Sequence, residues 1–441
     1  MASPEFNKYK ELYAINELAF KTKTDLIKSS YITSICPPFQ SFSDPRNKRG
    51  PENYKRYLNI GNYISHPQIC LDAALGLVNK GEDEVTLPAN LEDIIDYATK
   101  EGTNLTTIKN EIITSIFKYG SALIKVVIPE NVSIANTTPK IEVIDGLKVA
   151  DYGTFLDDEG LQHFNFIVID TTRNIFDPKT KYYNTVKLYK ILSLDEDGLY
   201  YEAEMPQNIY TSFNFLRPLD SKEKLLSFYQ PTWTGPLDFI PVIGINKLNC
   251  IFKYSQSFIQ DLIETSLHNY RLSCTLGWLE LNAAASHLVI KGKNLDDVSS
   301  YPLGAGAVHV LNDESASESF LTPSTAGMDE IKKHIEENNN LIDSMQYSLL
   351  NAGANASGES LQFRISVKCA DLISLIKNIG SGVTRVLEMI DEIVNDGKNK
   401  DSIEFIPYLD FDKINEFISS SITELKHVET HEVNNTEEND K

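Results

Sequence analysis

One loop of small residues decides how this sequence is interpreted, and it reads Asn351-Ala352-Gly353-Ala354-Asn355-Ala356-Ser357-Gly358-Glu359-Ser360. Apolar residues recur at helical spacing on both sides of it, within residues 324–396. Loops often carry function, and glycine lets a backbone come close to another molecule. The pattern therefore predicts a helix, a loop and a longer helix, with some molecule passing close to the loop. Taken alone, the loop is better explained as a plain flexible connector.

A further helix and a small β-containing insert precede this arrangement. Apolar positions from Phe258 to Trp278 recur at three- and four-residue steps, which predicts a helix of about six turns. The insert that follows has predicted strands at 287–290 and 319–321, with a tight turn at 304–307 between them. The sequence thus predicts two long helices that are separated by a β insert.

The first half of the chain changes from helices to strands. Residues 7–30 predict one helix, and a later helix is expected to end at Gly120, before a strand at 121–128. From residue 140 to residue 245, short β-rich runs alternate with turn signals, including a hairpin turn at 195–198. These runs predict an antiparallel sheet, and the whole chain is expected to have an α+β fold.

Acidic residues greatly outnumber basic ones in this chain of 441 residues. The 62 Asp and Glu residues against 41 Lys and Arg residues give a formal net charge of −21. A protein that grips nucleic acid by its phosphates needs clustered Lys and Arg, so the charge argues against that class. Solubility is one interpretation of the charge, and a surface that meets nucleic acid without adhering to it is the other.

The cysteines and the N-terminus predict where the protein folds. The five cysteines are widely spaced and form no Cys-x-x-Cys pair, which predicts reduced, mostly buried thiols and folding inside the cell. Residues 1–6 lack the basic and apolar regions of a signal peptide. No apolar run approaches the roughly 18 residues of a membrane span, so we expect a soluble protein without a membrane partner.

The common catalytic and cofactor motifs are absent from the sequence. It contains no Walker A pattern, no GxGxxG after a strand, no HExxH and no GxSxG. His427 and His431 are four residues apart, but they lie in a tail without apolar spacing, which is a poor context for a metal site. The sequence therefore predicts no catalytic residues, no metal site and no cofactor.

Several short segments occur in an order that matches one known family. They are Asn79-Lys80-Gly81 with Val85-Thr86-Leu87-Pro88, Gly102-Thr103-Asn104-Leu105 through Tyr119-Gly120-Ser121-Ala122, Phe239-Ile240-Pro241-Val242, His268-Asn269-Tyr270-Arg271, Gly358-Glu359-Ser360-Leu361 with Arg364, and Asp410-Phe411-Asp412. Each is weak alone, but their order from about residue 9 to about residue 425 is specific. In this respect the chain resembles the portal (head-to-tail connector) proteins of tailed bacteriophages, in particular the compact siphovirus and podovirus portals.

The resemblance implies a portal-type fold with eight parts. These parts are a mixed α/β wing at 1–253, a stem helix at 254–281, a clip at 282–325, a second stem helix at 326–350, a tunnel loop at 351–360, a long wing helix at 361–400, a short crown-like region at 401–426 and a disordered acidic tail at 427–441. The chain has less sequence after residue 425 than longer relatives have, which puts a full helical crown in doubt.

The resemblance also implies a function and its partners. Portals form a ring of about 12 copies at one capsid vertex, and such a ring is a homo-oligomer closed by rotational symmetry. Double-stranded DNA passes through the ring without sequence specificity. The expected partners are the terminase large subunit, a head–tail adaptor, and the major capsid and scaffolding proteins. The protein would be assembled in the host cytoplasm and located in the virion. A terminase ATPase would supply the energy, and the portal itself would not be an enzyme.

Three groups of site residues follow from the resemblance. The tunnel loop would face DNA through Asn351, Gly353, Asn355, Ser357, Gly358 and Glu359. The clip would dock the terminase and the adaptor through His287, Lys291, Lys293 and His309. The basic residues Arg46, Lys48 and Arg49 would contact the capsid or packaged DNA, although an ordinary solvated loop is the alternative for these three.

Two other functions stay open at the level of the sequence. One is a different ring-forming head–tail connector or adaptor component, although such chains are usually much shorter. The other is a hydrolase that uses paired carboxylates, with Glu359 in a mobile loop. In that case Glu359→Ala would abolish turnover, whereas a portal has no turnover to lose.

Overall fold

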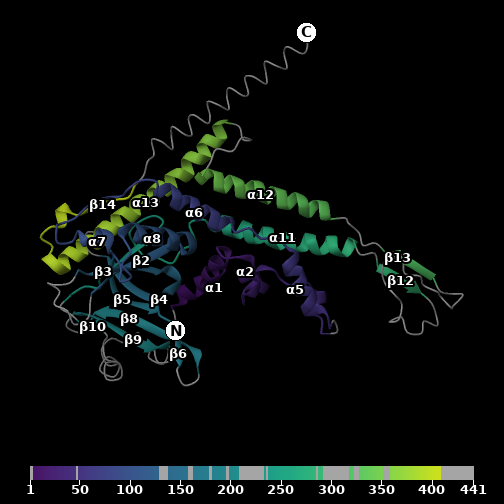
Figure 1. Cartoon of the computed structure of the whole chain (residues 1–441), viewed down its shortest axis with the longest axis horizontal. Helices are drawn as coiled ribbons and strands as arrows, with labels where there is room; N and C mark the ends of the chain where they lie inside the picture. Colours follow the sequence, from purple (N-terminus) through teal and green to yellow (C-terminus); the bar gives the residue numbers. More distant parts are fainter. Residues whose placement is uncertain are drawn as a thin grey trace, which may run out of the picture. The chain divides into compact units, whose positions relative to one another are not determined.

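A computed structural model gives the fold of the chain (Figure 1). It describes residues 3–45, 48–128, 138–156, 162–177, 181–194, 198–207, 233–234, 237–284, 287–291, 317–321, 327–350 and 358–408. The contacts divide the chain into two compact units. Unit 1 comprises Met1–Lys21, His66–Ile263 and Ser344–Lys441, and unit 2 comprises Thr22–Ser65 and Glu264–Asp343.

Unit 1 contains most of the strands and the longest helix. Its helices are α1 (Pro4–Ala19), α6 (His66–Val78), α7 (Asp93–Asp96), α8 (Leu105–Tyr119), α13 (Gly358–Asn395) and two 3-10 turns, η2 (Gly146–Lys148) and η4 (Lys400–Ser402). Its strands are β1 (Glu84–Thr86), β2 (Ser121–Val127), β3 (Lys140–Asp145), β4 (Val149–Leu156), β5 (Gln162–Asp170), β6 (Arg173–Asp177), β7 (Tyr182–Val186), β8 (Leu188–Leu194), β9 (Tyr200–Pro206), β10 (Trp233–Thr234), β11 (Val242–Asn246) and β14 (Glu404–Ile406).

Unit 2 is mainly helical. It contains α2 (Lys23–Lys28), α3 (Ile32–Ile35), α4 (Gln40–Ser43), α5 (Gly50–Ile60), β12 (His287–Lys291) and β13 (Ser317–Leu321). Two helices have residues in both units, α11 (Gln260–Ala284) and α12 (Met328–Leu350). The predicted α+β class is confirmed.

Helix α8 is the central helix of unit 1. Asn104 caps its first turn, because the Asn104 side chain accepts a hydrogen bond from the backbone N–H of Thr107 at 3.0 Å. Its apolar face is fully buried, including Ile108, Ile112 and Ile116. Gly120 ends the helix in the left-handed conformation, with φ of +75°, as the sequence predicted.

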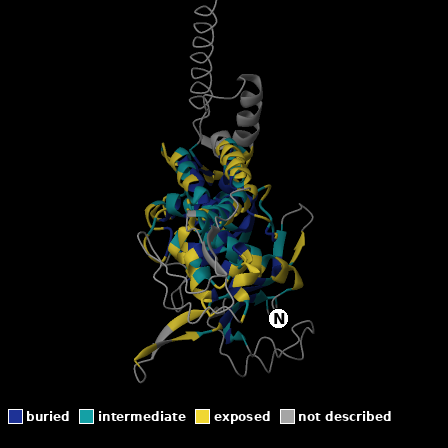
Figure 2. Cartoon of the chain, turned by 90° about the vertical axis from the view of Figure 1, so that its right-hand side faces the viewer, coloured by how far each residue is buried: buried dark blue, intermediate teal, exposed yellow. Residues whose placement is uncertain are grey.

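Two antiparallel sheets make up most of the strands of unit 1, and the smaller one packs against α8. The smaller has the order β11-β2-β3, and the larger has the order β10-β9-β8-β5-β4. Strand β2 is buried on both faces, and the largest sheet has its own apolar core around Val168 and Ile191. Buried residues (dark blue in Figure 2) therefore concentrate between strands and helices.

A buried ionic cluster joins the two sheets. Nζ of Lys125 on β2 and Nζ of Lys190 on β8 each lie 2.6 Å from the carboxylate of Glu202 on β9. Burial lowers the pKa of Lys125 to about 8, against the opposing effect of Glu202. Burial alone would raise the pKa of Glu202, but the two lysines outweigh it and hold that pKa at about 2.

A second buried ion pair ties α8 to the C-terminal strand region. Nζ of Lys109 donates to Asp83 at 2.6 Å and to the carbonyl of Val78 at 3.1 Å. The same carboxylate accepts the backbone N–H of Tyr408 at 2.9 Å. Because β14 also pairs with β1, the described part of the predicted crown-like region belongs to unit 1.

Helix α13 packs closely on the sheets through its glycines. A Cβ at Gly380 would lie 2.7 Å from Cδ of Pro407, and a Cβ at Gly382 would collide with Ile245 on β11. The helix continues without interruption from Gly358 to Asn395. The two glycines therefore let α13 approach β11 and the segment after β14 closely.

Aromatic side chains and two thiols hold unit 2 together. Phe42 on α4 contacts Tyr57 on α5 and Trp278 on α11, with ring centroids 5.8 and 5.1 Å away. The buried thiols of Cys36 and Cys274 share a hydrogen bond, which together with burial raises the pKa of Cys36. The segment from Thr22 to Ser65 therefore packs with α11, although the sequence placed it in the wing.

One local prediction is wrong. Residues 7–30 form two helices, because the side chain of Thr22 caps a new helix by accepting the N–H of Asp25. The predicted sheet region includes β4, although Asp151, Gly153 and Thr154 interrupt the apolar pattern of this strand. The hairpin between β8 and β9 is confirmed, and Gly198 in it has a φ of +78°.

Candidate functional site

A helix–hairpin–helix segment is the main candidate site. It runs from α11 through β12 and β13 to α12 (Figure 1). The strands pair antiparallel, with His287 opposite Leu321 and Lys291 opposite Ser317. The sequence thus predicted the order of these four elements correctly.

Helices α11 and α12 run antiparallel, and their contacts continue the order of the strand pairs. The Nδ2 atom of Asn269 donates to Oδ1 of Asn339 at 2.7 Å, and Lys332 forms an ion pair with Glu280 at 3.2 Å. These two pairs and the strand pairs all lie symmetrically about residues 304–306. The predicted tight turn at 304–307 is outside the described residues, but it occupies the centre of this symmetry in the sequence.

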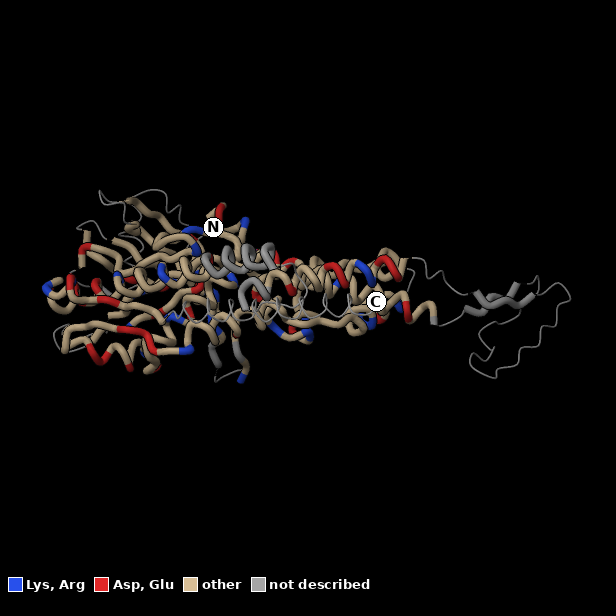
Figure 3. The backbone as a smooth tube through the Cα atoms, turned by 90° about the horizontal axis from the view of Figure 1, so that it is seen from above, with Lys and Arg blue, Asp and Glu red and all other residues tan. Residues whose placement is uncertain are grey.

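Helix α12 has one inward face and is otherwise exposed. Ile342 is buried, Ile331 and Ile335 are half-buried, and these positions share one face of the helix. Acidic and basic positions alternate along its remaining surface (Figure 3). Helix α12 therefore presents a large charged surface on unit 2.

The predicted clip residues lie in and around the hairpin. His287 is the first residue of β12 and Lys291 is the last, whereas Lys293 and His309 are outside the described residues. His287 and Lys291 are thus at the two ends of one strand of the hairpin.

The predicted tunnel loop is only partly within the described residues. Asn351, Gly353, Asn355 and Ser357 are outside them, while the backbones of Gly358 and Glu359 form the first turn of α13. The loop is therefore shorter at its C-terminal end than the sequence suggested.

The predicted basic residues lie at the start of α5. Arg46 is outside the described residues, and Lys48 and Arg49 are exposed immediately before the helix. The sequence interpretation missed that Lys55 and Arg56, one to two turns further on, are exposed too. Basic residues at helical spacing were the available signal for this extension.

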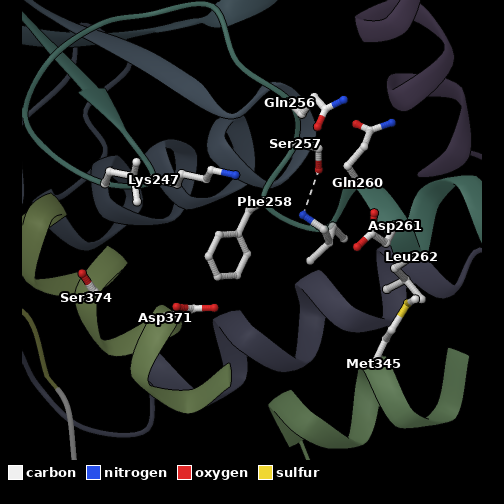
Figure 4. A pocket seen from close by; sticks show the side chains of 12 residues that line it. Lys247, Gln256, Ser257, Phe258, Gln260, Asp261, Leu262, Met345, Asp371 and Ser374 are labelled. Carbon is white, nitrogen blue, oxygen red and sulfur yellow. Dashed lines mark hydrogen bonds between the residues drawn. The ribbon is translucent and has the colours of Figure 1, made fainter. Parts of the chain in front are cut away.

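A pocket of about 340 Å³ in unit 1 was not predicted (Figure 4). Its lining comes from the segment before α11, the end of α12 and the described part of α13, and includes Phe258, Met345, Lys247 and Asp371. In Figure 4 the side chains of Lys247 and Asp371 lie on either side of the Phe258 ring. Its residues come from distant parts of the chain, so no local pattern could have predicted it.

The pocket combines an apolar floor with charged groups at its edge. Phe258, Leu262 and Met345 supply apolar surface, and Lys247, Asp261 and Asp371 supply charge of both signs. Figure 4 draws one hydrogen bond among the lining residues, from the backbone N–H of Ile259 to Oγ of Ser257, at 3.1 Å.

Among the described residues, no group of three or more His, Cys, Asp and Glu side chains is placed to hold a metal ion. No described helix is both long and apolar enough to span a membrane.

Comparisons with known proteins give only distant structural matches. No family model matches the chain, and no curated protein matches it. It is similar to a chain in the neck of a native gene transfer agent (GTA) particle computed with C12 symmetry, with 11% identity, coverage of 78% of this chain and 79% of that chain, and a TM-score of 0.37. It is also similar to a chain in the virion of the native GTA particle, with 11% identity, coverage of 82% and 85%, and a TM-score of 0.38. A third match, in the neck of the empty particle computed with C6 symmetry, has 11% identity, coverage of 80% and 83%, and a TM-score of 0.38.

Proposed function

We propose that this protein is a phage portal: a non-enzymatic ring at one capsid vertex through which double-stranded DNA is packaged and ejected. The observation that carries the proposal is the helix–hairpin–helix segment, with α11, β12, β13 and α12 in the order that the sequence resemblance implies. In this proposal α11 and α12 are the stem helices, and the hairpin belongs to the clip. The sheets of unit 1 and α13 belong to the wing.

The charge of the chain suits a channel through which DNA slides. A bore lined with Lys and Arg would bind DNA by releasing counterions and would hold it in place. At −21 per chain, a ring of copies is strongly acidic and does not grip phosphates in this way. Small residues at Asn351, Gly353 and Asn355 would let the loop approach DNA closely, with Ser357, Gly358 and Glu359 at its base.

The proposal assigns different partners to the clip and to the wing. The clip, with His287, Lys291, Lys293 and His309, would dock the terminase large subunit during packaging and a head–tail adaptor afterwards. The wing would contact the major capsid and scaffolding proteins. The protein would then be a virion component.

Oligomeric state is the direct test of the proposal. Negative-stain electron microscopy of the purified full chain is expected to show closed rings of about 12 copies, since homo-oligomers of this kind close by rotational symmetry. A chain that stays monomeric at high concentration would contradict the proposal. If the protein forms rings but contributes nothing to DNA packaging, a different ring-forming connector component would be the better interpretation.

The loop is tested by adding bulk to it. Ala354→Trp or Asn355→Trp is expected to block DNA packaging while rings still assemble, because an indole would narrow the channel. Lys8→Trp on the exposed side of α1 is the matched control and should leave packaging unchanged. Normal DNA content in the loop variants would remove the loop from the channel.

The hydrolase alternative loses its main premise in this structure. It requires Glu359 in a mobile loop, but Glu359 lies in the first turn of α13. A turnover activity that disappears in Glu359→Ala would nevertheless restore that alternative and overturn the proposed function.

A further inference from the structure

Two outer parts of unit 2 carry opposite charge. One is the basic layer, which we define as Lys48, Arg49, Lys55 and Arg56 at the start of and along α5. Four cations against one anion, Glu52, give residues 48–60 a formal charge of +3. In a chain of net charge −21, this local excess of positive charge is exceptional.

The other is the acidic face of α12. We define it by the five exposed carboxylates of that helix, which are Asp329, Glu330, Glu336, Glu337 and Asp343. Five anions against two cations, Lys332 and Lys333, give α12 a formal charge of −3. The two segments therefore match in magnitude and differ in sign.

Helix α11 lies between these two segments within unit 2. Tyr270 on α11 donates its hydroxyl to the carbonyl of Leu58 on α5 at 2.9 Å, whereas Asn269 donates to Asn339 on α12. Adjacent residues of a helix point about 100° apart, so α5 and α12 occupy different sides of α11. Figure 1 shows α12 above α11 and α5 below it.

Both charged surfaces point away from α11. The inward positions of α12 are Ile331, Ile335 and Ile342, so its carboxylates cover the rest of the helix. The inward positions of α5 are Tyr57 and Leu58, which are buried, while Lys55 and Arg56 are exposed. The partners of Glu337 within the chain, Lys333 and His334, are exposed, and such pairs contribute little.

We propose that the basic layer of one copy docks against the acidic face of α12 on the next copy. The inference rests on the proposed ring, and it names the surfaces that join neighbouring copies. Two different complementary surfaces on one chain make a head-to-tail interface, which closes into a ring when the rotation between copies is suitable. Charge complementarity speeds such an encounter and fixes its register.

Exposed apolar side chains accompany both surfaces. Ile60, at the end of α5, is 38% exposed, and Leu341, on α12, is 44% exposed. An interface needs some apolar burial beneath its charged groups, because exposed ion pairs alone contribute little. Leu341 is placed to supply it, whereas Ile60 lies partly against Gly277 of α11 and offers only its exposed edge.

A charge-swap experiment on the full chain tests the proposal. Lys55→Glu with Arg56→Glu puts carboxylates opposite carboxylates. It is expected to raise the concentration needed for ring formation by about tenfold or more, because facing like charges oppose association. Adding Glu336→Lys and Glu337→Lys to the same chain should restore rings. Mass photometry and negative-stain images report assembly, and circular dichroism reports folding.

The matched control reverses two other exposed lysines. Lys8→Glu with Lys10→Glu on α1 changes the net charge by the same amount and should leave ring formation unchanged. An equal loss of rings in this control would show that only the net charge matters, and the proposed interface would be wrong.

Each remaining outcome separates the inference from the proposed function. Rings that form normally in the Lys55→Glu, Arg56→Glu chain would overturn the interface and leave the portal proposal standing. Rings that are lost but not restored by the α12 changes would show that the basic layer meets a different surface of the neighbouring copy, and the assignment of α12 as its partner would be wrong. A wild-type chain that never forms rings would overturn both.

Discussion

The buried carboxylate of Glu202 links the three-stranded and five-stranded sheets of unit 1. It lies 2.6 Å from each of two lysine ammonium groups, and Lys125 is 1% exposed. Removing one partner of a buried ionic cluster leaves uncompensated charge behind. Glu202→Gln is therefore expected to lower the free energy of unfolding by about 3–5 kcal/mol, as measured by urea denaturation. An exposed carboxylate such as Glu5, changed to Gln, is the control and should have little effect.

Glu202 also makes the stability of unit 1 depend on pH in the acidic range, and its pKa fixes the direction of that dependence. The pKa of Glu202 is about 2 in the folded protein against an ordinary value of 4.5, so below pH 4.5 the unfolded chain binds the extra proton. The stability that this group contributes is thus complete above pH 4.5 and is lost as the pH falls toward 2. Between pH 2 and pH 4.5, the free energy of unfolding measured by urea denaturation should therefore change less with pH for Glu202→Gln than for the wild type. An identical slope would contradict the ionic role.

The sequence alone could not identify the carboxylate that pairs with Lys125. A lysine within the apolar strand Ser121–Val127 indicates that its charge must be compensated, because an isolated buried ammonium group is very costly. Which carboxylate compensates it depends on how β2 and β9 pack, and they belong to different sheets. Local patterns predict strands but not the faces that meet across two sheets.

At the scale of elements, the junction of α8 and β2 depends on Gly120. It has a φ of +75°, and a Cβ there would collide with the backbone oxygen of Gln256. Gly198 has a similar φ of +78° but has no neighbouring atom within 4 Å of such a Cβ. Gly198→Ala should cost about 1–2 kcal/mol from the left-handed backbone alone. Gly120→Ala should cost clearly more in the same urea experiment, and equal losses would show that the collision is relieved without cost.

The packing of α13 on β14 gives a second prediction at this scale. A Cβ at Gly380 would lie 2.7 Å from Pro407 and 3.2 Å from the carbonyl oxygen of Phe405, and neither atom belongs to a flexible side chain. Overpacking of this kind costs about 1–3 kcal/mol, so Gly380→Ala should lower stability. Gly76→Ala on α6, with open space around it, should instead raise stability by about 0.5–1 kcal/mol. A stabilising Gly380→Ala would mean that α13 packs less closely than described.

Helices and strands were predicted well where one pattern dominated. The apolar spacing of α11, α12 and α13 placed them within a few residues, and Gly120 marked the end of α8. The break at Thr22 was missed because the apolar positions of α1 and α2 stay roughly in phase across it. The grouping of α2–α5 with α11 was missed because it depends on contacts between distant aromatic residues, such as Phe42 and Trp278.

At the scale of the whole molecule, the acidic balance predicts weak contact with free DNA. At about 0.15 M salt, charges are screened beyond about 8 Å, so the four cations of the basic layer act without support, and so few phosphate contacts release too few counterions for tight binding. Mobility-shift experiments with the purified protein and double-stranded DNA should therefore show no stable complex. Tight, salt-sensitive binding would indicate a gripping surface and would contradict a sliding channel.

The symmetry of the helix–hairpin–helix segment has a consequence for how such proteins diversify. Partners in both the helices and the strands lie symmetrically about residues 304–306. Extra residues added at that centre would lengthen the segment without changing which positions pair. Residues added to one arm alone would shift every pair beyond them. The centre is thus the natural position for grafting a foreign peptide, and for evolution to adjust the reach of the hairpin toward a new partner.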